Sequence, residues 1–330
     1  MEILQNALKA LVAREAIYFA LLAIGLNIQF GYAGLLNFGQ VGFSLLGAYG
    51  IAITVTTWGG SYWLGLGVGL AAAVVLALLL GLPTLRLRAD YLAIATIAAA
   101  EMLRLGFRTP SATEITGGTQ GLQGFSGEFY ELSPFPLDKK YHPFGILFTG
   151  QELWLLTVGW TLVALLVLAV WLWGRSPWGR VLKAIREDED AARALGKNVY
   201  WYKMQALIVG GVIGALGGAV QATATRSVDP DTYLPIVTFY AYAALILGGT
   251  ARPLGPVIGA SLLFALLSVT DSVLRDLTTG DNPVISSDIL DSQAIAATRF
   301  VLVGAGLIAL MAFRPQGIFG SRTEVSIDAK

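Results

Sequence analysis

The chain has 330 residues, of which 55% are hydrophobic and 13% are charged, and its 22 basic side chains balance 22 acidic ones. Soluble globular proteins carry about 25% charged residues, so this sequence cannot cover a water-facing surface of ordinary size, and most of it is expected to lie in lipid. The absence of cysteine excludes a disulfide framework, a thiolate metal site and a cysteine nucleophile, and the zero net charge argues against nucleic acid as a partner.

The N-terminal third contains four apolar segments that are expected to span a bilayer. The first covers residues 11–30, and it lacks the strongly basic start and the small-residue cleavage site of a signal peptide. The others cover residues 38–57, 62–82 and 90–106, each close to the roughly 20 residues that a spanning helix needs.

A break rich in glycine and asparagine, residues 31–37, separates the first two segments. It is either a turn between two spans or part of a broken, re-entrant helix, and these alternatives place Met1 on opposite sides of the membrane. Irregular backbone at membrane depth is tolerated only where it faces protein or a watery cavity. The region is therefore either a glycine-rich packing seam or part of a solute pathway. The candidate pathway residues are Asn27, Gln29, Gly31, Tyr32, Gly34, Asn37, Gln40 and Ser44.

The fourth segment carries two charges that stand three residues apart, Glu101 and Arg104. Residues at this spacing share one helical face, and adjacent opposite charges lower each other's cost in lipid. We interpret them as a structural ion pair rather than as substrate ligands. No run of intramembrane carboxylates suggests a proton relay.

Residues 107–151 are too polar to span and are expected to form an external loop. Thr-Gly-Gly-Thr-Gln-Gly at 116–121 is typical of turns with positive φ, and it forms either a plain turn or an outer gate. The single histidine, His142, is expected to be an exposed loop residue, and one histidine excludes a His-rich metal centre. The candidate gate residues are Thr116, Gly117, Gly118 and Gly121.

The second half alternates apolar and polar segments. A charged block, residues 174–203, lies among its spans, and a polar tail, residues 314–330, ends the chain. We therefore predict an all-α integral membrane protein with one transmembrane domain over residues 1–330. It is a polytopic helical bundle of about eight full spans, or up to ten if short or re-entrant segments are counted. The expected spans of this half cover residues 153–173, 204–223, 235–250, 255–274 and 295–313.

One short sequence recurs. Gly39-Gln-Val-Gly-Phe-Ser-Leu-Leu resembles Gly255-Pro-Val-Ile-Gly-Ala-Ser-Leu-Leu. This indicates either an internal repeat, as many transporter folds have, or the shared composition of membrane helices.

Basic residues predict the orientation, because lysine and arginine accumulate in cytoplasmic loops. Residues 174–203 alone hold seven of them and are placed inside. Alternation from there puts thirteen basic residues inside and five outside. The block 174–203 and the tail 314–330 are therefore expected to be cytoplasmic, and residues 107–151 extracytoplasmic.

The charged block has the pattern of two short helices. Leu182 and Ile185 belong to an apolar stripe on the first helix, and the acidic run 187–190 suits the N-terminal turn of the second. Gly196 is expected to end the second helix. No Gly-x-x-x-x-Gly-Lys-Ser/Thr phosphate loop occurs in the chain, so ATP-driven transport would need the nucleotide on another subunit.

The same block carries a specific resemblance. Asp190-Ala-Ala-Arg-Ala-Leu-Gly196 resembles the Glu/Asp-Ala-Ala-x-x-x-Gly pattern of the coupling loop in ABC importer permeases. Gly179-Arg-x-Leu-x-Ala-Ile-Arg is similar to the form of this loop in the branched-chain amino acid permeases of the LivM-like family. Aspartate at 190 departs from glutamate but keeps the charge. Three further stretches resemble that family: Gly31-Tyr-Ala-Gly-Leu-Leu-Asn-Phe-Gly-Gln, Thr116-Gly-Gly-Thr-Gln-Gly-Leu and Phe313-Arg-Pro-Gln-Gly-Ile-Phe-Gly.

The resemblance implies a multi-pass permease subunit of a bacterial plasma (inner) membrane that imports branched-chain or other neutral amino acids by alternating access. It implies no catalytic residue, metal or cofactor on this chain. The implied partners are a second related permease subunit, two ATP-binding subunits that hold ATP, and an extracytoplasmic solute-binding protein that docks near residues 116–121. The residues implied to couple the chain to the ATP-binding subunit are Gly179, Arg180, Ile185, Arg186, Asp190, Ala191, Ala192 and Gly196.

Two alternatives stay open at this point. A urea or short-chain amide ABC permease has a similar coupling loop. A stand-alone secondary transporter or channel is a different class, and the coupling-type loop argues against it.

Overall fold

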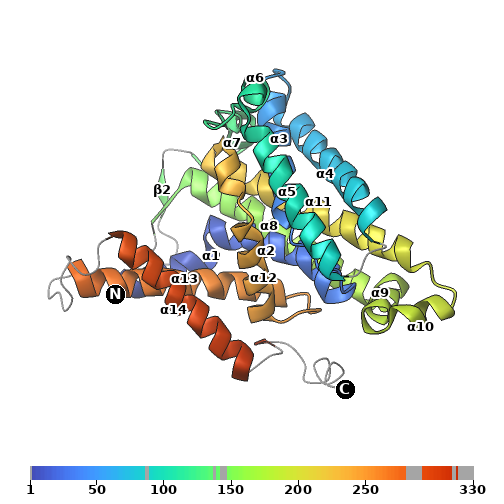
Figure 1. The fold of residues 1–330 in the computed structure, drawn as a ribbon. Coiled ribbons are helices and arrows are strands. Elements are labelled where there is room, and N and C mark those ends of the chain that lie inside the picture. The colour runs from blue at the N-terminus through green and yellow to red at the C-terminus, as the bar shows by residue number, and fades with distance from the viewer. Residues whose placement is uncertain are drawn as a thin grey trace.

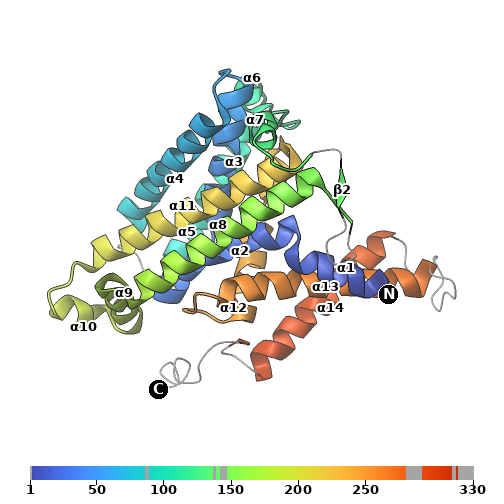
Figure 2. The same ribbon diagram turned by 180° about the vertical axis from the view of Figure 1, so that it is seen from behind.

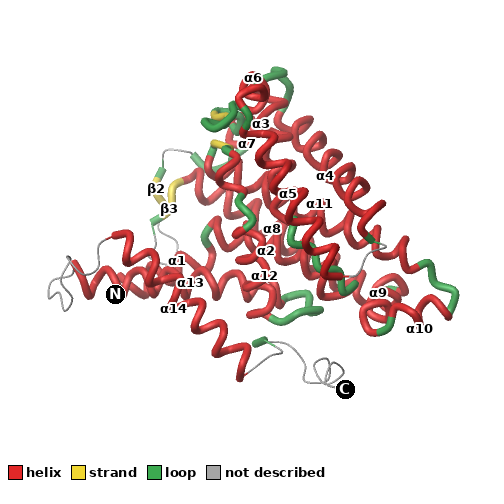
Figure 3. The backbone as a smooth tube through the Cα atoms, in the orientation of Figure 1, coloured by secondary structure: helices red, strands yellow, loops and turns green. Residues whose placement is uncertain are grey.

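The computed structural model describes residues 2–85, 89–136, 139–141, 147–279, 292–313 and 317–318. Over these residues the protein is almost entirely helical, with two short antiparallel strand pairs (Figure 3). The all-α fold class expected from composition is confirmed. His142, Arg86, Arg88 and the tail from 319 to 330 lie outside the described residues.

The elements follow one another in a simple order. The strand β1 (Leu122–Gln123) pairs with β4 (Ser227–Val228), and β2 (Lys140–Tyr141) pairs with β3 (Phe148–Thr149). The helices are α1 (Glu2–Val12), α2 (Arg14–Leu26), the π-helix η1 (Asn27–Tyr32), α3 (Gln40–Thr56), α4 (Tyr62–Thr84), α5 (Ala89–Arg108), the 3-10 helix η2 (Pro110–Ala112), α6 (Thr113–Thr116), α7 (Gly127–Glu131), α8 (Gly150–Arg175), α9 (Pro177–Glu187), α10 (Glu189–Ala194), α11 (Val199–Thr225), the 3-10 helix η4 (Pro230–Tyr233), α12 (Ile236–Gly248), α13 (Gly255–Thr279) and α14 (Ser292–Phe313).

The spans differ in length from the expectation. α3 and α12 were predicted as full spans but have 17 and 13 residues, fewer than the roughly 20 that cross the hydrocarbon core. The reason is that α3 begins, and α12 ends, at irregular backbone inside the bundle. Shorter apolar helical segments are Gln40–Thr56 (α3), Ile236–Gly248 (α12) and Ala297–Gly306 within α14. The described segments that are long and apolar enough to span are Asn6–Tyr32, Tyr62–Thr84, Gly150–Arg175, Val199–Thr225 and Gly255–Thr278.

Small residues place α3 at the centre of the bundle, where it packs against α4, α5 and α11. A Cβ added at Gly47 would collide with the carbonyl oxygen of Ala215 on α11. A Cβ added at Gly50 would collide with the backbone of Gly69 on α4. Such close backbone approach stabilises helix pairs in lipid, where apolar burial gives little drive for association.

The bundle has two distinct ends. α9 and α10 lie together at one end, and α6 and α7 lie at the other (Figures 1 and 2). We call these the α9 end and the α7 end. The long helices α8 and α11 run between the two ends.

Candidate functional site

A hydrogen-bonded polar cluster, made by Gln29, Asn37 and Gln40, surrounds the break between α2 and α3. Asn37 Nδ2 donates to Gln29 Oε1 at 2.9 Å and to Gln40 Oε1 at 3.2 Å. Gln29 Nε2 donates to the carbonyl oxygen of Leu207 at 3.2 Å. Gln40 Nε2 donates to that of Gly210, also on α11, at 2.9 Å. These bonds hold the broken helix against α11, which satisfies the requirement that irregular backbone at this depth faces protein.

The same break is hydrogen-bonded to α12 and to the segment that joins α12 to α13. The Tyr242 hydroxyl accepts from the Asn37 backbone N–H and donates to the Asn37 carbonyl oxygen, both at 3.1 Å. Asn27 Nδ2 donates to the carbonyl oxygen of Arg252 at 2.9 Å, and Asn27 Oδ1 accepts from the N–H of Ala251 at 2.8 Å. The segments before the two similar sequences at 39–46 and 255–263 are therefore joined by hydrogen bonds through Asn27 and Tyr242. That the two sequences are an internal repeat stays a prediction.

The polar candidates for a pathway are closed to solvent in this conformation. The Ser44 hydroxyl lies 3.0 Å from that of Tyr18, a bond between α3 and α2. In this conformation the region is packed like the glycine-rich seam considered above. A pathway lined by these side chains would form only if α2, α3 and α11 separate. The side chains that are 0% exposed are Asn27, Gln29, Asn37, Gln40 and Ser44.

α9 and α10 form a compact pair at the α9 end, which we call the α9–α10 unit (residues 177–196). The Ser176 hydroxyl caps α9, and Asp188 caps α10 by accepting from the N–H of Ala191 at 2.9 Å. Gly196, with a φ of 76°, lies in the left-handed region just after α10. The two short helices expected from the sequence are therefore present.

The residues implied to couple the chain to an ATP-binding subunit do not form one surface. Ile185 and Ala192 pack with Val199 and hold the unit to the start of α11. The buried members are Gly179, Ile185 and Ala192. The exposed members are Arg180, Asp190, Ala191 and Gly196.

Sequence reasoning missed Leu195, whose side chain is 79% exposed at the tip of the unit. Charged residues surround it in the sequence, as Arg193 precedes it and Lys197 follows. Its exposure at the tip of the unit makes Leu195 a candidate contact for a partner protein. A lone leucine within a charged run is the signal that could have identified it.

Arg186 points inward and joins the α9–α10 unit to the broken helix. Its guanidinium donates to the carbonyl oxygen of Gly31 in η1. A Cβ added at Gly34, where φ is 68°, would lie 3.1 Å from Arg186 Cγ, so the loop after η1 packs directly on this side chain. Lys183 Nζ lies 5.4 Å from the centre of the Tyr32 ring. α9 is therefore in direct contact with the backbone next to the polar cluster.

A sequence model of the family described as the permease component of the branched-chain amino acid transport system matches residues 10–311. The chain belongs to this permease family. The match covers the polar cluster, the α9–α10 unit and the segment between α12 and α13, so these features lie within the region that defines the family.

Three relatives show the range of the family. The permease is 28% identical over 316 residues to the high-affinity branched-chain amino acid transport system permease protein LivM of Escherichia coli, covering 93% of this chain and 69% of that protein. It is 26% identical over 289 residues to a probable branched-chain amino acid transport permease protein LivM of Methanocaldococcus jannaschii, covering 76% and 77%. It is 27% identical over 273 residues to the nucleoside ABC transporter permease protein NupC of Lactococcus lactis, covering 80% and 82%. All three are named as permeases, two of them for branched-chain amino acids and the third for nucleosides.

In the permease, Arg104 pairs with Glu101 at 2.6 Å and 2.9 Å and also contacts Asp231 in η4 at 2.7 Å. Arg108 lies 3.6 Å from Asp231, and the Arg104 side chain is only 7% exposed. The network ties α5 to the segment after α11, which fits a structural role. Asp231 could not be identified from spacing, because it lies 127 residues from Arg104.

The loop at residues 116–121 lies at the α7 end and leads into a strand that pairs with the chain after α11. Gly117, Gly118 and Gly121 have φ values of 74°, 57° and 71°, which only glycine adopts readily. The next strand, β1, pairs with β4, with Leu122 opposite Val228. The turn expected from the glycines is therefore present, and it fixes this loop to the chain after α11.

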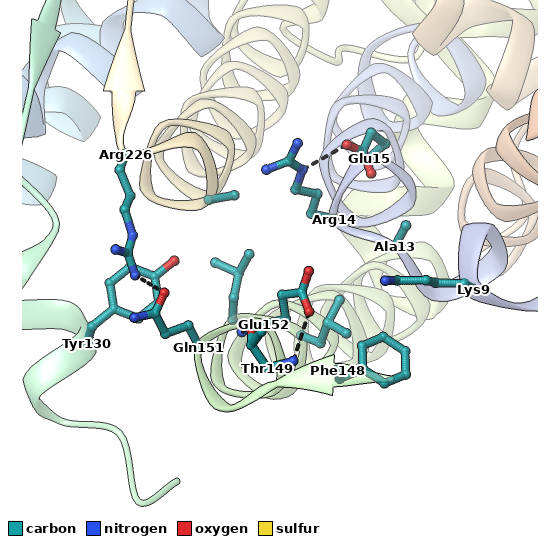
Figure 4. A pocket seen from close by; sticks show the side chains of 13 residues that line it. Lys9, Ala13, Arg14, Glu15, Tyr130, Phe148, Thr149, Gln151, Glu152 and Arg226 are labelled. Carbon is teal, nitrogen blue, oxygen red and sulfur yellow. Dashed lines mark hydrogen bonds and ion pairs between the residues drawn. The ribbon is translucent and has the colours of Figure 1, made fainter. Parts of the chain in front are cut away.

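A pocket of about 430 Å³ opens near the α7 end, between α1, α2, α8 and the end of α11 (Figure 4). Arg14 pairs with Glu15 at 2.8 Å, and the Arg226 guanidinium lies 4.3 Å from the centre of the Tyr130 ring. Burial raises the pKa of Tyr130, and Arg226 acts in the opposite direction. Cations and carboxylates therefore line one small space. The charged lining residues are Lys9, Arg14, Glu15, Glu152 and Arg226.

Proposed function

We propose that the permease is the membrane-embedded subunit of an ATP-driven importer of branched-chain or other neutral amino acids. One observation carries the proposal. The α9–α10 unit exposes Leu195 and Gly196 at one end of the bundle, and its inner side is bonded through Arg186 to the broken helix at Gly31. This is the arrangement that a subunit needs if a partner's movement is to open a path through it.

The proposed partners occupy both ends. Two ATP-binding subunits hold ATP and dock on the α9–α10 unit, and a second related permease subunit completes the pathway. An extracytoplasmic solute-binding protein docks near residues 116–121. In this arrangement residues 174–203 and the tail 314–330 are cytoplasmic, and residues 107–151 are external. Residues 1–330 form one transmembrane domain, which lies in a bacterial inner membrane. The chain itself holds neither metal nor cofactor.

The proposed mechanism is alternating access. Closure of the ATP-binding subunits displaces α9, and Arg186 carries the displacement to the Gly31–Gly34 backbone. When α2, α3 and α11 separate, Gln29, Asn37 and Gln40 exchange bonds to one another for bonds to water and solute. The exchange conserves hydrogen bonding, so opening does not leave buried polar groups unsatisfied.

The docking role predicts that Gly196→Trp lowers ATP-driven uptake at least about tenfold while ATP hydrolysis continues. A Cβ added at Gly196 meets no atom within 4 Å, so the ring projects away from this chain and into the docked subunit. Uptake and ATPase activity are measured together in proteoliposomes. Gly196→Ala is the control, since alanine meets the same backbone strain at this positive φ and adds little bulk. Normal uptake by Gly196→Trp at equal subunit levels contradicts the docking role.

The pathway predicts that a thiol at position 44 reacts only during turnover. Ser44→Cys changes one atom, and native cysteines do not interfere because the chain has none. In the resting complex a charged maleimide is expected to label it slowly, since residue 44 is 0% exposed. ATP and solute are expected to speed labelling at least about tenfold. Ser111→Cys, at an exposed position, labels equally in both states. A thiol at position 44 that stays protected throughout turnover refutes the pathway.

An amino acid substrate is supported by the pocket of Figure 4 as well as by the family. Its mixed cations and carboxylates match the two charges of a zwitterion, which urea and simple amides lack. Binding assays on the solute-binding protein separate these substrate classes. The remaining alternative is a stand-alone secondary transporter or channel. It predicts that the purified permease transports solute in liposomes that contain no ATPase.

A further inference from the structure

A second cavity of about 650 Å³ lies on the spanning surface between α8 and α13. Both helices pack against α2, which lies between them (Figure 2). Both also belong to segments long and apolar enough to cross a membrane, so the groove lies at the depth of the bilayer. Its lining is Trp160, Val163, Ala164, Val167, Leu168, Trp171, Arg252, Pro253, Leu254, Gly255, Val257 and Ile258.

The groove has the length of one leaflet. Its lining on α8 runs from Trp160 to Trp171, which is about 16 Å at 1.5 Å per residue. Half of the hydrocarbon core is about 15 Å thick. Trp171 lies four residues before the end of α8 and is 39% exposed, where interfacial tryptophans usually lie. The groove therefore covers the leaflet at the α9 end.

The mouth of the groove at the α9 end is cationic. Arg252 lines it, and the Arg175 guanidinium lies 4.0 Å from the centre of the Trp171 ring. In the described part of the chain, neither arginine belongs to an ion pair with a carboxylate. The acidic residues of α8 and α13 all lie at the opposite ends of these helices, at Glu152, Asp271 and Asp276.

The chemistry of the groove distinguishes between occupants. Its lining along α8 and α13 is apolar, which suits an acyl chain, and an anionic headgroup complements the two arginines at its mouth. We propose that the groove binds an anionic glycerophospholipid of the leaflet at the α9 end, with its acyl chain along α8 and its phosphate beside Arg252 and Arg175.

The position of this lipid connects it to the broken helix. The carbonyl oxygen of Arg252 accepts from Asn27, and the N–H of the preceding residue, Ala251, donates to Asn27. A phosphate bound to the Arg252 side chain restrains the backbone that holds Asn27. The lipid thereby stabilises the loop between α12 and α13 whatever solute the permease carries.

Native mass spectrometry of the purified transporter tests the charge requirement, with dioleoylphosphatidylglycerol and dioleoylphosphatidylcholine as probes. Arg252→Gln is expected to weaken retention of phosphatidylglycerol about fivefold and to leave phosphatidylcholine unchanged. The backbone bond to Asn27 survives, because the substitution alters only the side chain. Arg252→Lys is expected to keep most of the phosphatidylglycerol. Equal retention by all three proteins overturns the proposal.

A steric variant tests the location. Ala164→Trp fills the groove and is expected to remove both lipids, whereas Leu165→Trp, at a neighbouring position 59% exposed and outside the lining, retains them. Unchanged retention by Ala164→Trp places the lipid elsewhere and overturns the proposal. Efficient cross-linking of Leu168→Cys to the second permease subunit would show that protein covers the groove. That result also overturns the proposal.

Discussion

Arg186→Ala is expected to lower ATP-driven uptake at least about tenfold, a loss comparable to that from an obstructed docking surface. The substitution removes the hydrogen bond to the Gly31 carbonyl and the side chain on which Gly34 packs. α9 can then move without displacing the broken helix, so ATP hydrolysis continues and solute does not cross. Uptake and ATPase activity in the same proteoliposomes measure the separation of the two activities.

Arg186→Lys is the matched control for this experiment. Lysine keeps the positive charge and the aliphatic stem on which Gly34 packs, and its ammonium group can donate to the Gly31 carbonyl oxygen. This variant is therefore expected to keep most of the uptake. If Arg186→Ala transports as well as Arg186→Lys, the contact with Gly31 does not transmit movement.

Gly47→Ala is expected to destabilise the permease by roughly 3 kcal/mol, the upper end of the usual cost of overpacking. The added methyl group would overlap the carbonyl oxygen of Ala215. A side chain could rotate away, but the backbone of α11 cannot, so α3 and α11 must move apart. Reversible unfolding in mixed micelles measures the loss.

Gly67→Ala, on α4, is the control for the packing effect. A Cβ there meets no atom within 4 Å, and alanine has the higher helix propensity by about 1 kcal/mol. This variant is therefore expected to be as stable as the original protein or slightly more stable. Equal stability of Gly47→Ala and Gly67→Ala contradicts the close packing of α3 against α11.

Most of the helices could be predicted because the reasons for them are local. Apolar runs of about 20 residues, interrupted by glycine, proline and charge, specify spanning helices wherever they occur. The α9–α10 unit was equally predictable, since Asp188 caps its second helix and Gly196 ends it within a few residues of sequence. The lengths of α3 and α12 were not, because their inner ends are decided by contacts with other helices.

The candidate site could be predicted only in part. Asn37, Gln29 and Gln40 stood out as polar residues in an apolar region, but the bonds from the two glutamines to α11 join positions 170 or more residues apart. Asp231 and Leu195 were missed for different reasons. Asp231 pairs with an arginine that is distant in the sequence, whereas Leu195 stands in the sequence only as a leucine within a charged run, and its exposure is visible only in the folded chain.

The sequence by itself determined that this chain lies in a membrane, that it is helical, and that it carries a charged two-helix unit of the kind found in ABC permeases. Composition, hydropathy and local capping suffice for the membrane location, the helices and the two-helix pattern, and the likeness to ABC permeases comes from the resemblance of residues 179–196 to their coupling loop. The tertiary structure decided that Arg186 faces Gly31, that the polar cluster is closed, and that a cationic groove runs beside α8. These depend on how distant segments pack, and packing between helices is set by shape across the whole bundle rather than by neighbours in the chain.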